Sequence, residues 1–191
     1  MAGGRGFLRA DMKFLAAIAI PSYVLDQLTK WWIYTHYMLV PSEQNLARFP
    51  DVVEKGAHLP MESDVIPGWF QIVHWANTGA AFSMGSGNNW FFIVLSALTF
   101  VGLLVAWKKN VFTDKPSRWG VALLLGGILG NVTDRIVHGY VVDFLLFDLH
   151  VKFANPWPAF NVADSCIFVA AGCFLVSGFF DARKAKPPVE S

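Results

Sequence analysis

Two copies of an amide–carboxylate pair are the residues of this chain best suited to chemistry. Asn131 and Asp134 form the first pair, and Asn161 and Asp164 form the second. The two side chains of each pair are three residues apart, so a helix would place them on one face. A third acid, Asp143, lies between the copies in a short apolar stretch. Acids beside long apolar runs are costly, so we interpret the three carboxylates and two amides as one carboxylate-based active site.

The composition predicts a small membrane protein that is mainly α-helical. The chain has 191 residues, of which 54% are hydrophobic and 15% are charged. Its mean hydropathy of +0.43 is too high for an ordinary soluble domain. A net charge of +1 and dispersed basic residues argue against a nucleic-acid partner. Cys166 and Cys173 fall seven apart in one apolar run, too far apart on a helix for a disulfide.

Four apolar runs are long enough to cross a membrane, since a span needs about 20 residues. We expect transmembrane helices over about 14–34, 90–107, 119–136 and 162–180, within a single domain covering 1–191. We expect the first to be an uncleaved signal anchor, because Asp26 and Lys30 interrupt its end and no small-residue cleavage site follows. Most basic residues precede the first run, separate the second from the third, or follow the fourth: Arg5, Arg9, Lys13, Lys108, Lys109, Lys115, Arg118, Arg183, Lys184 and Lys186. The positive-inside rule therefore predicts that both termini are cytoplasmic.

The segments 37–89 and 137–161 would then face outward, and the acids gather at that face. Residues 41–68 show no clear period and are expected to be irregular or mobile. Residues 66–75 alternate partly like a strand, with Pro67 and Gly68 as its turn, and residues 141–147 are also β-prone. We therefore expect a small outward-facing β or loop subdomain on the membrane surface.

Several of these residues also have structural interpretations. Asn161, at the start of the fourth run, is a natural helix N-cap. Asp26 and Lys30 form either an internal i, i+4 salt bridge or a contact with substrate. The segment 77–79 is either a simple turn or part of the site. Close helix packing is predicted at Gly126, Gly127 and Gly130. No metal site is expected, because metal-ligand spacing is absent among His36, His58, His74, His138 and His150.

Five motifs together resemble those of the bacterial lipoprotein signal peptidase family (signal peptidase II). They are Asp26 to Lys30; Asn77 to Ser83; Gly126 to Asn131 with Asp134 and Arg135; Val141 to Phe144; and Phe160 to Ser165. They occur in the family's order from the first apolar run to the last, over roughly residues 14–180. The outward segment 38–64 is longer than is usual for the family.

The resemblance implies an aspartic endopeptidase of the bacterial inner membrane, with its active site at the periplasmic face and no metal or other cofactor. Its substrate would be a prolipoprotein with diacylglyceryl on a cysteine, cut on the N-terminal side of that cysteine. Membrane lipid and this precursor are the only partners implied, with no nucleic acid and no obligate protein partner. By motif, the catalytic pair is Asp143 and Asp164. The supporting or substrate-binding residues are Asp26, Lys30, Asn77, Gly79, Asn131, Asp134, Arg135, Asn161 and Ala163.

Physical reasoning favours the same pair. Two neighbouring carboxylates share one proton, because the charge of one raises the pKa of the other. The ionised acid takes a proton from water while its partner protonates the scissile carbonyl. Asp143 has apolar neighbours in the chain, and desolvation there favours keeping a proton. Asp134 stands next to Arg135, which would keep it ionised as an orienting group if the two side chains met.

Two other classes of function are possible for acids in a membrane. A small ion-coupled transporter would place its acids near the midplane between repeats, whereas here they cluster at one face. A non-catalytic membrane scaffold would tolerate replacement of Asp143 and Asp164 by asparagine. The peptidase interpretation predicts that either replacement abolishes cleavage.

Overall fold

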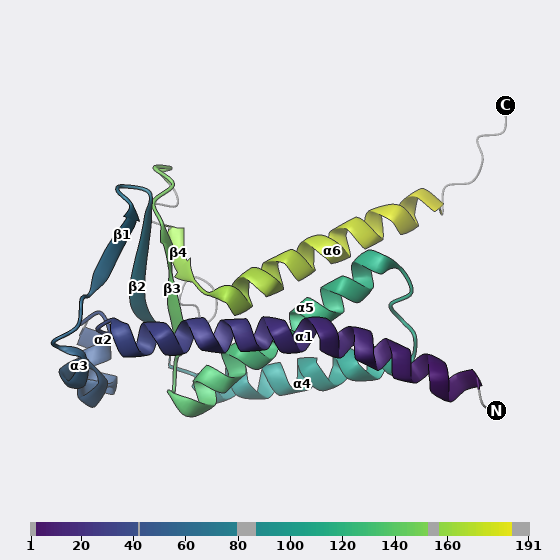
Figure 1. The fold of residues 1–191 in the computed structure, drawn as a ribbon, viewed down its shortest axis with the longest axis horizontal. Helices are drawn as coiled ribbons and strands as arrows, with labels where there is room; N and C mark the ends of the chain where they lie inside the picture. Colours follow the sequence, from purple (N-terminus) through teal and green to yellow (C-terminus); the bar gives the residue numbers. More distant parts are fainter. Residues whose placement is uncertain (1–2, 42, 80–86, 153–156, 185–191) are drawn as a thin grey trace.

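A computed structural model describes residues 3–41, 43–79, 87–152 and 157–184, and these form a helical bundle with a small sheet at one end (Figure 1). The long helices are α1 (Gly3–His36), α4 (Asn89–Lys108), α5 (Lys115–Val137) and α6 (Val162–Lys184). The start of α1 and the end of α6 both lie at the end of the bundle away from the sheet. The described chain therefore enters and leaves the bundle on the same side.

Helix α5 is the centre of the bundle, because it packs against α1, α4 and α6. Glycines on α5 allow this close approach, as predicted. A Cβ atom on Gly126 would lie 2.9 Å from the Ala19 carbonyl oxygen of α1. A Cβ atom on Gly127 would lie 2.6 Å from the Ala163 carbonyl oxygen of α6. The two glycines thus set the distances from α5 to α1 and to α6.

Three helices among the described residues are long and apolar enough to cross a membrane: α4 (Asn89–Lys108), α5 (Lys115–Val137) and the Val162–Phe180 part of α6. They coincide with the second, third and fourth predicted runs. Helix α1 begins at Gly3 rather than near residue 14. It is longer than the other three, but the polar residues in both of its ends lower its hydropathy, and it does not meet the same criterion.

The sheet is antiparallel with strand order β1-β2-β3-β4. Its strands are β1 (Glu62–Ile66), β2 (Phe70–Asn77), β3 (Val141–Phe147) and β4 (Trp157–Phe160). The predicted strand over 141–147 is confirmed. The predicted turn is also confirmed, and Gly68 has φ +75° between β1 and β2. The strand predicted over 66–75 was wrong in its bounds, because Ile66 ends β1 and β2 begins only at Phe70. Strand β4 was not predicted.

The prediction that residues 41–68 are irregular was wrong. This segment forms two short helices, α2 (Glu43–Arg48) and α3 (Pro50–Gly56), followed by β1. Phe49 packs its ring on Tyr140 with centroids 4.6 Å apart, and Val53 is buried. Both join an apolar cluster beneath the sheet whose buried members are Ile33, Tyr37, Leu39, Val53, Tyr140, Val142 and Phe144. Helices of six and seven residues are too short to show a period, so tertiary packing decides their structure.

Candidate active site

All the predicted site residues meet where the helices reach the sheet. Asp143 is on β3, Asn77 ends β2 and Asp164 is in the first turn of α6. The C-terminal parts of α5 and α1 supply most of the others, which are Asn131, Asp134, Arg135, Asp26 and Lys30. The pairing of β2 with β3, which sets Trp75 opposite Asp143 and Asn77 opposite Val141, brings Asn77 to the same place. Five elements therefore converge on one polar cluster.

Asn161 connects the two acids of the predicted pair. Its side-chain Nδ2 donates to Asp143 Oδ1 at 2.8 Å. Its backbone N–H donates to Asp164 Oδ2 at 3.3 Å, and the Asp164 N–H donates back to Asn161 Oδ1 at 2.8 Å. This reciprocal pattern is a capping box at the start of α6. The structural and site interpretations of Asn161 thus hold together, because the side chain that caps the helix also contacts Asp143.

Asp143 lies in a buried environment with amide donors on both of its oxygens. Its side chain is 3% exposed, and Asn77 Nδ2 donates to its Oδ2 at 2.8 Å. Burial, followed by the negative charge of Asp164, raises the pKa of Asp143 well above its usual range. The hydrogen bonds from Asn77 and Asn161 and the charge of Lys30 oppose this rise only in part. Asp143 is therefore the acid best suited to hold a proton near neutral pH.

Asp164 is half-buried and accepts a hydrogen bond from a different amide side chain, that of Asn131. Asn131 Nδ2 donates to its Oδ1 at 2.8 Å. The amide of the first sequence copy thus serves the acid of the second copy, and Asn161 of the second copy serves the unpaired Asp143. The two Asn-x-x-Asp copies cross-connect through these amides instead of forming two independent halves.

Lys30 and Asp26 form the internal salt bridge that was one of the two alternatives. Lys30 Nζ lies 2.9 Å from Asp26 Oδ2 and 3.0 Å from Asp134 Oδ2, and the lysine is 3% exposed. Both acids are also held by backbone donors: Ala163 N–H to Asp26 Oδ1 at 2.8 Å, and Val142 N–H to Asp134 Oδ2 at 3.0 Å. This ion cluster therefore joins α1 and α5 to the start of α6 and to β3.

The cation beside Asp134 is Lys30 rather than Arg135. The guanidinium of Arg135 donates from Nη2 to the Gly79 carbonyl at 2.7 Å and lies over the Phe92 ring at 5.1 Å. Gly79 in turn donates its N–H to Asn77 Oδ1 at 3.0 Å. Residues 77–79 therefore form a turn, and this turn also fixes the side chain of the site residue Asn77. The rest of the motif, Ala80 to Ser83, lies outside the described residues.

One site residue was missed by the sequence reasoning. Gln27 Nε2 lies 3.2 Å from Asp26 Oδ2, 3.2 Å from the Gly130 carbonyl and 3.1 Å from Asp134 Oδ1. Gln27 belongs to the first motif, but neighbouring helical residues do not share a face, so its contact with Asp134 was not expected. The signal that could have identified Gln27 is its place between Asp26 and Lys30, where polar residues interrupt the first apolar run.

Among the histidines, His74 is buried, with Nδ1 3.0 Å from the Tyr37 carbonyl and Nε2 3.4 Å from the Tyr140 hydroxyl. Burial lowers the pKa of His74 to about 4, so the ring is neutral at physiological pH. In the described part of the chain, no three His, Cys, Asp or Glu side chains are arranged to hold a metal ion.

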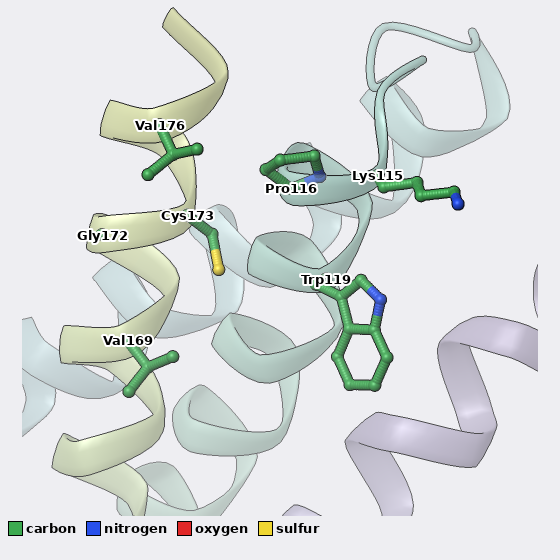
Figure 2. Close-up of a pocket in the computed structure, with 7 residues that line it drawn as sticks. All are labelled: Lys115, Pro116, Trp119, Val169, Gly172, Cys173 and Val176. Carbon is green, nitrogen blue, oxygen red and sulfur yellow. The ribbon is translucent and has the colours of Figure 1, made fainter. Parts of the chain in front are cut away.

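A separate hollow lies between the first turns of α5 and the middle of α6 (Figure 2). It has a volume of about 480 Å³ and is lined by Lys115, Pro116, Trp119, Val169, Gly172, Cys173 and Val176. Trp119 stands about 18 Å along α5 from Asn131, at 1.5 Å per residue. The hollow contains no acid, so it does not extend the polar cluster at the sheet.

Comparison with protein families gives one match that covers most of the chain. The model described as Signal peptidase (SPase) II matches residues 18–180. A lipoprotein signal peptidase of Symbiobacterium thermophilum is 36% identical over 167 residues, which cover 87% of this chain and 95% of that protein. A lipoprotein signal peptidase of Psychromonas ingrahamii is 38% identical over 178 residues, covering 91% of this chain and 87% of that protein.

Solved structures have the same fold. A bacterial membrane enzyme solved at 2.3 Å superposes with a TM-score of 0.69 at 23% identity, covering 93% of this chain and 94% of that chain. A second, solved at 1.9 Å, has a TM-score of 0.66 at 25% identity, covering 85% of this chain and 90% of that chain. The arrangement of apolar helices and a small antiparallel sheet is therefore that of a membrane-embedded enzyme.

Proposed function

We propose that this chain, which belongs to the signal peptidase II family of membrane proteases and removes signal peptides from prolipoproteins, cleaves with Asp143 and Asp164 as an aspartate dyad. One observation carries the proposal: Asn161 hydrogen-bonds both carboxylates, although one belongs to β3 and the other to α6. The charge of Asp164 acts on Asp143, and two acids coupled in this way share a proton more readily than they both ionise.

The proposed reaction uses the two acids in opposite protonation states. Ionised Asp164 takes a proton from water as the water oxygen attacks the scissile carbonyl carbon, and Asp143 gives its proton to the carbonyl oxygen. The resulting gem-diol collapses when Asp143 takes back a proton from one hydroxyl. The C–N bond breaks, and the leaving nitrogen receives the proton that Asp164 had accepted. Both acids then return to their starting states.

The proposed substrate carries diacylglyceryl on a cysteine, and the bond cut lies on the N-terminal side of that cysteine. The position of the acids supports this substrate. Asp164 is in the first turn of an apolar helix and Asp143 is on the adjoining sheet, so both stand where hydrocarbon gives way to the polar surface. A peptide anchored by acyl chains presents its lipidated residue at that depth.

We also propose that α1 is a fourth span, with both termini in the cytoplasm and the site at the periplasmic face of the inner membrane. The side chains of α1 that point away from the bundle are large and apolar, among them Ile20, Leu25 and Leu28. Its charged residues Asp26 and Lys30 are buried inside the bundle. The α4–α5 connection, at the end away from the sheet, has basic residues in the loop and in the adjoining helix ends, which favours the cytoplasm for that end; they are Lys108, Lys109, Lys115 and Arg118.

The test uses the full chain in proteoliposomes and two precursor peptides that differ only in the cysteine. One carries the diacylglyceryl thioether, and the other has the free thiol. We expect mass spectrometry to find the cut immediately before the lipidated cysteine, and kcat/KM at least about 100-fold lower for the unlipidated peptide, because burial contributes about 0.8 kcal/mol per methylene. Equal cleavage of both peptides would contradict recognition of the lipid, and a cut at another bond would contradict the proposed position.

A further inference from the structure

Three amide side chains surround the two acids, and each turns its NH₂ group toward a carboxylate. Asn77 Nδ2 and Asn161 Nδ2 each lie 2.8 Å from an oxygen of Asp143. Asn131 Nδ2 lies 2.8 Å from Asp164 Oδ1. An amide turned by 180° would present its oxygen instead, and oxygen next to a carboxylate is repulsive. The direction of each amide therefore bears directly on the protonation of the acids.

Each amide is held in its direction by a group that can only donate. The oxygen of Asn77 accepts from the Gly79 N–H at 3.0 Å, and the oxygen of Asn161 accepts from the Asp164 N–H at 2.8 Å. The oxygen of Asn131 accepts from Lys30 Nζ at 2.9 Å. Backbone N–H groups and ammonium groups have no acceptor, so none of the three amides can turn without losing its bond. Only the third of these donors is a side chain, and mutation can remove it.

The ammonium of Lys30 has no donor left for anything else. Its three N–H groups are matched by three oxygens, on Asp26, Asp134 and Asn131, at 2.9, 3.0 and 2.9 Å. The two acids are fixed in their turn by the backbone N–H groups of Ala163 and Val142. Lys30 is therefore fully committed inside the protein, which excludes direct contact between its ammonium and a substrate in this arrangement.

We propose that Lys30 is a positioning residue for the reaction: it holds the Asn131 amide so that its NH₂ group donates to Asp164 and favours the ionised form that activates water. This inference rests on the proposed dyad and assigns Lys30 a role beyond its ion pairs. A purely structural salt bridge would tie α1 to α5 and would act on the dyad only through the charge of its lysine, which opposes the rise in the pKa of Asp143. That effect of charge is largely offset when Asp26 and Lys30 are replaced together, because one charge of each sign is removed. The two interpretations therefore differ in the pH dependence of the reaction in the charge-balanced double variant.

Loss of the ammonium releases the Asn131 amide only in part. Asn161 Nδ2 also donates to Asn131 Oδ1, at 3.2 Å, but that group is shared with Asp143. With Lys30 gone, the Asn131 oxygen can turn toward Asp164, and that arrangement is stable only when Asp164 carries a proton. The dyad then keeps a second proton to higher pH, and catalysis requires a higher pH.

The experiment compares wild type with Lys30→Met in proteoliposomes, using the lipidated precursor and measuring kcat and KM between pH 5 and 9. We expect kcat to fall about 100-fold at pH 7, with KM changed less than about threefold, and the acid limb of the kcat profile to move up by about one pH unit, so that activity is partly recovered at high pH. Lys55→Met provides the matched control, because Lys55 is exposed on α3, and its profile should match that of wild type.

Lys30→Met leaves two buried acids without a counter-ion, which destabilises a protein strongly. The double variant Asp26→Asn/Lys30→Met removes one charge of each sign, and an asparagine oxygen can still accept from the Ala163 N–H. Its melting temperature should stay within about 10 °C of wild type, and its acid limb should move as in the single variant. A loss of kcat by the same factor at every pH in this folded double variant, or a rise in KM in place of the loss of kcat, would overturn the positioning role.

The proposal of the dyad and the proposal for Lys30 can be refuted separately. Loss of cleavage in Asp143→Asn and Asp164→Asn with an unmoved acid limb in the Lys30 variants would refute only the positioning role. Normal cleavage by the two aspartate variants would refute the dyad, and the role of Lys30 with it.

Discussion

Replacing Asp143 by asparagine is expected to lower kcat by about 10³-fold or more while the protein stays folded in the membrane. Asparagine keeps the shape of the side chain, and its one oxygen can still accept the hydrogen bond from Asn77 or from Asn161, but it cannot give a proton to the scissile carbonyl. General acid catalysis alone contributes about 10²–10⁴-fold. The measurement is turnover of the lipidated precursor by purified variant in proteoliposomes, with the melting temperature as the check on folding.

Two further acids serve as comparisons for this prediction. Asp148→Asn removes an exposed carboxylate just beyond β3 and should leave turnover within about twofold of wild type. Asp134→Asn should keep measurable turnover, because Asp134 binds Lys30 and the Val142 N–H rather than the reacting atoms. If Asp134→Asn lost turnover as completely as Asp143→Asn, the two acids could not be distinguished as an orienting acid and a reacting acid. Normal turnover in Asp143→Asn would exclude Asp143 as the reacting acid.

The second large effect is expected from Gly127→Ala on α5. The added Cβ would lie 2.6 Å from the Ala163 carbonyl oxygen and 2.8 Å from Ile167 Cγ1, so the start of α6 must move away from α5. Overpacking of this kind costs about 1–3 kcal/mol. Displacement of α6 also draws Asp164 away from Asn131, and a misplacement of about 1 Å at a reacting group lowers the rate about 100-fold. We expect a lower melting temperature together with that loss of kcat/KM.

Gly102→Ala is the matched control for this substitution. Gly102 lies in the middle of α4, and a Cβ there meets no atom within 4 Å. This variant should match wild type in stability and activity, or gain slightly in stability because alanine is the better helix former. If Gly127→Ala were as stable and active as Gly102→Ala, the close contact between α5 and α6 would not be what positions Asp164.

The sequence was sufficient to identify the acids and the helices that carry them. Asn131 and Asp134, and Asn161 and Asp164, stand at the ends of apolar runs, and acids in such places are costly unless they have a function. That argument needs no partner to be known. The glycines of α5 were predicted to pack closely for a similar reason, since small residues on an apolar helix mark a helix interface.

The partners of these acids could not be predicted in the same way. Lys30 bonds Asn131 across 101 positions of the chain, and Gln27 bonds Asp134 across 107. Such contacts depend on how α1 and α5 cross, and no local pattern encodes the crossing. Arg135 shows the opposite error. Its place next to Asp134 suggested a pair, but successive helical residues point in different directions and Arg135 contacts Gly79 instead.

The prediction for the segment between α1 and β1 was wrong for a third reason. Helices α2 and α3 are too short for a hydrophobic period, and their stability comes from Phe49 and Val53 packing on residues such as Tyr140. Strand β4 has four residues, of which two are aromatic and one is proline, and carries little signal alone. These three elements can be predicted only once the position of β3 is known, because Phe49 and Val53 pack beside β3 and β4 pairs with it.

The most direct test of the dyad is an experimental structure of the full chain with a lipopeptide analogue whose scissile carbonyl is replaced by a hydroxyl-bearing carbon. That hydroxyl stands for the oxygen of the gem-diol. We predict that it lies within hydrogen-bond distance, about 2.6–3.2 Å, of one carboxylate oxygen of Asp143 and one of Asp164. A hydroxyl held by Asp134, or carboxylates of Asp143 and Asp164 too far apart for one oxygen to reach both, would contradict the account.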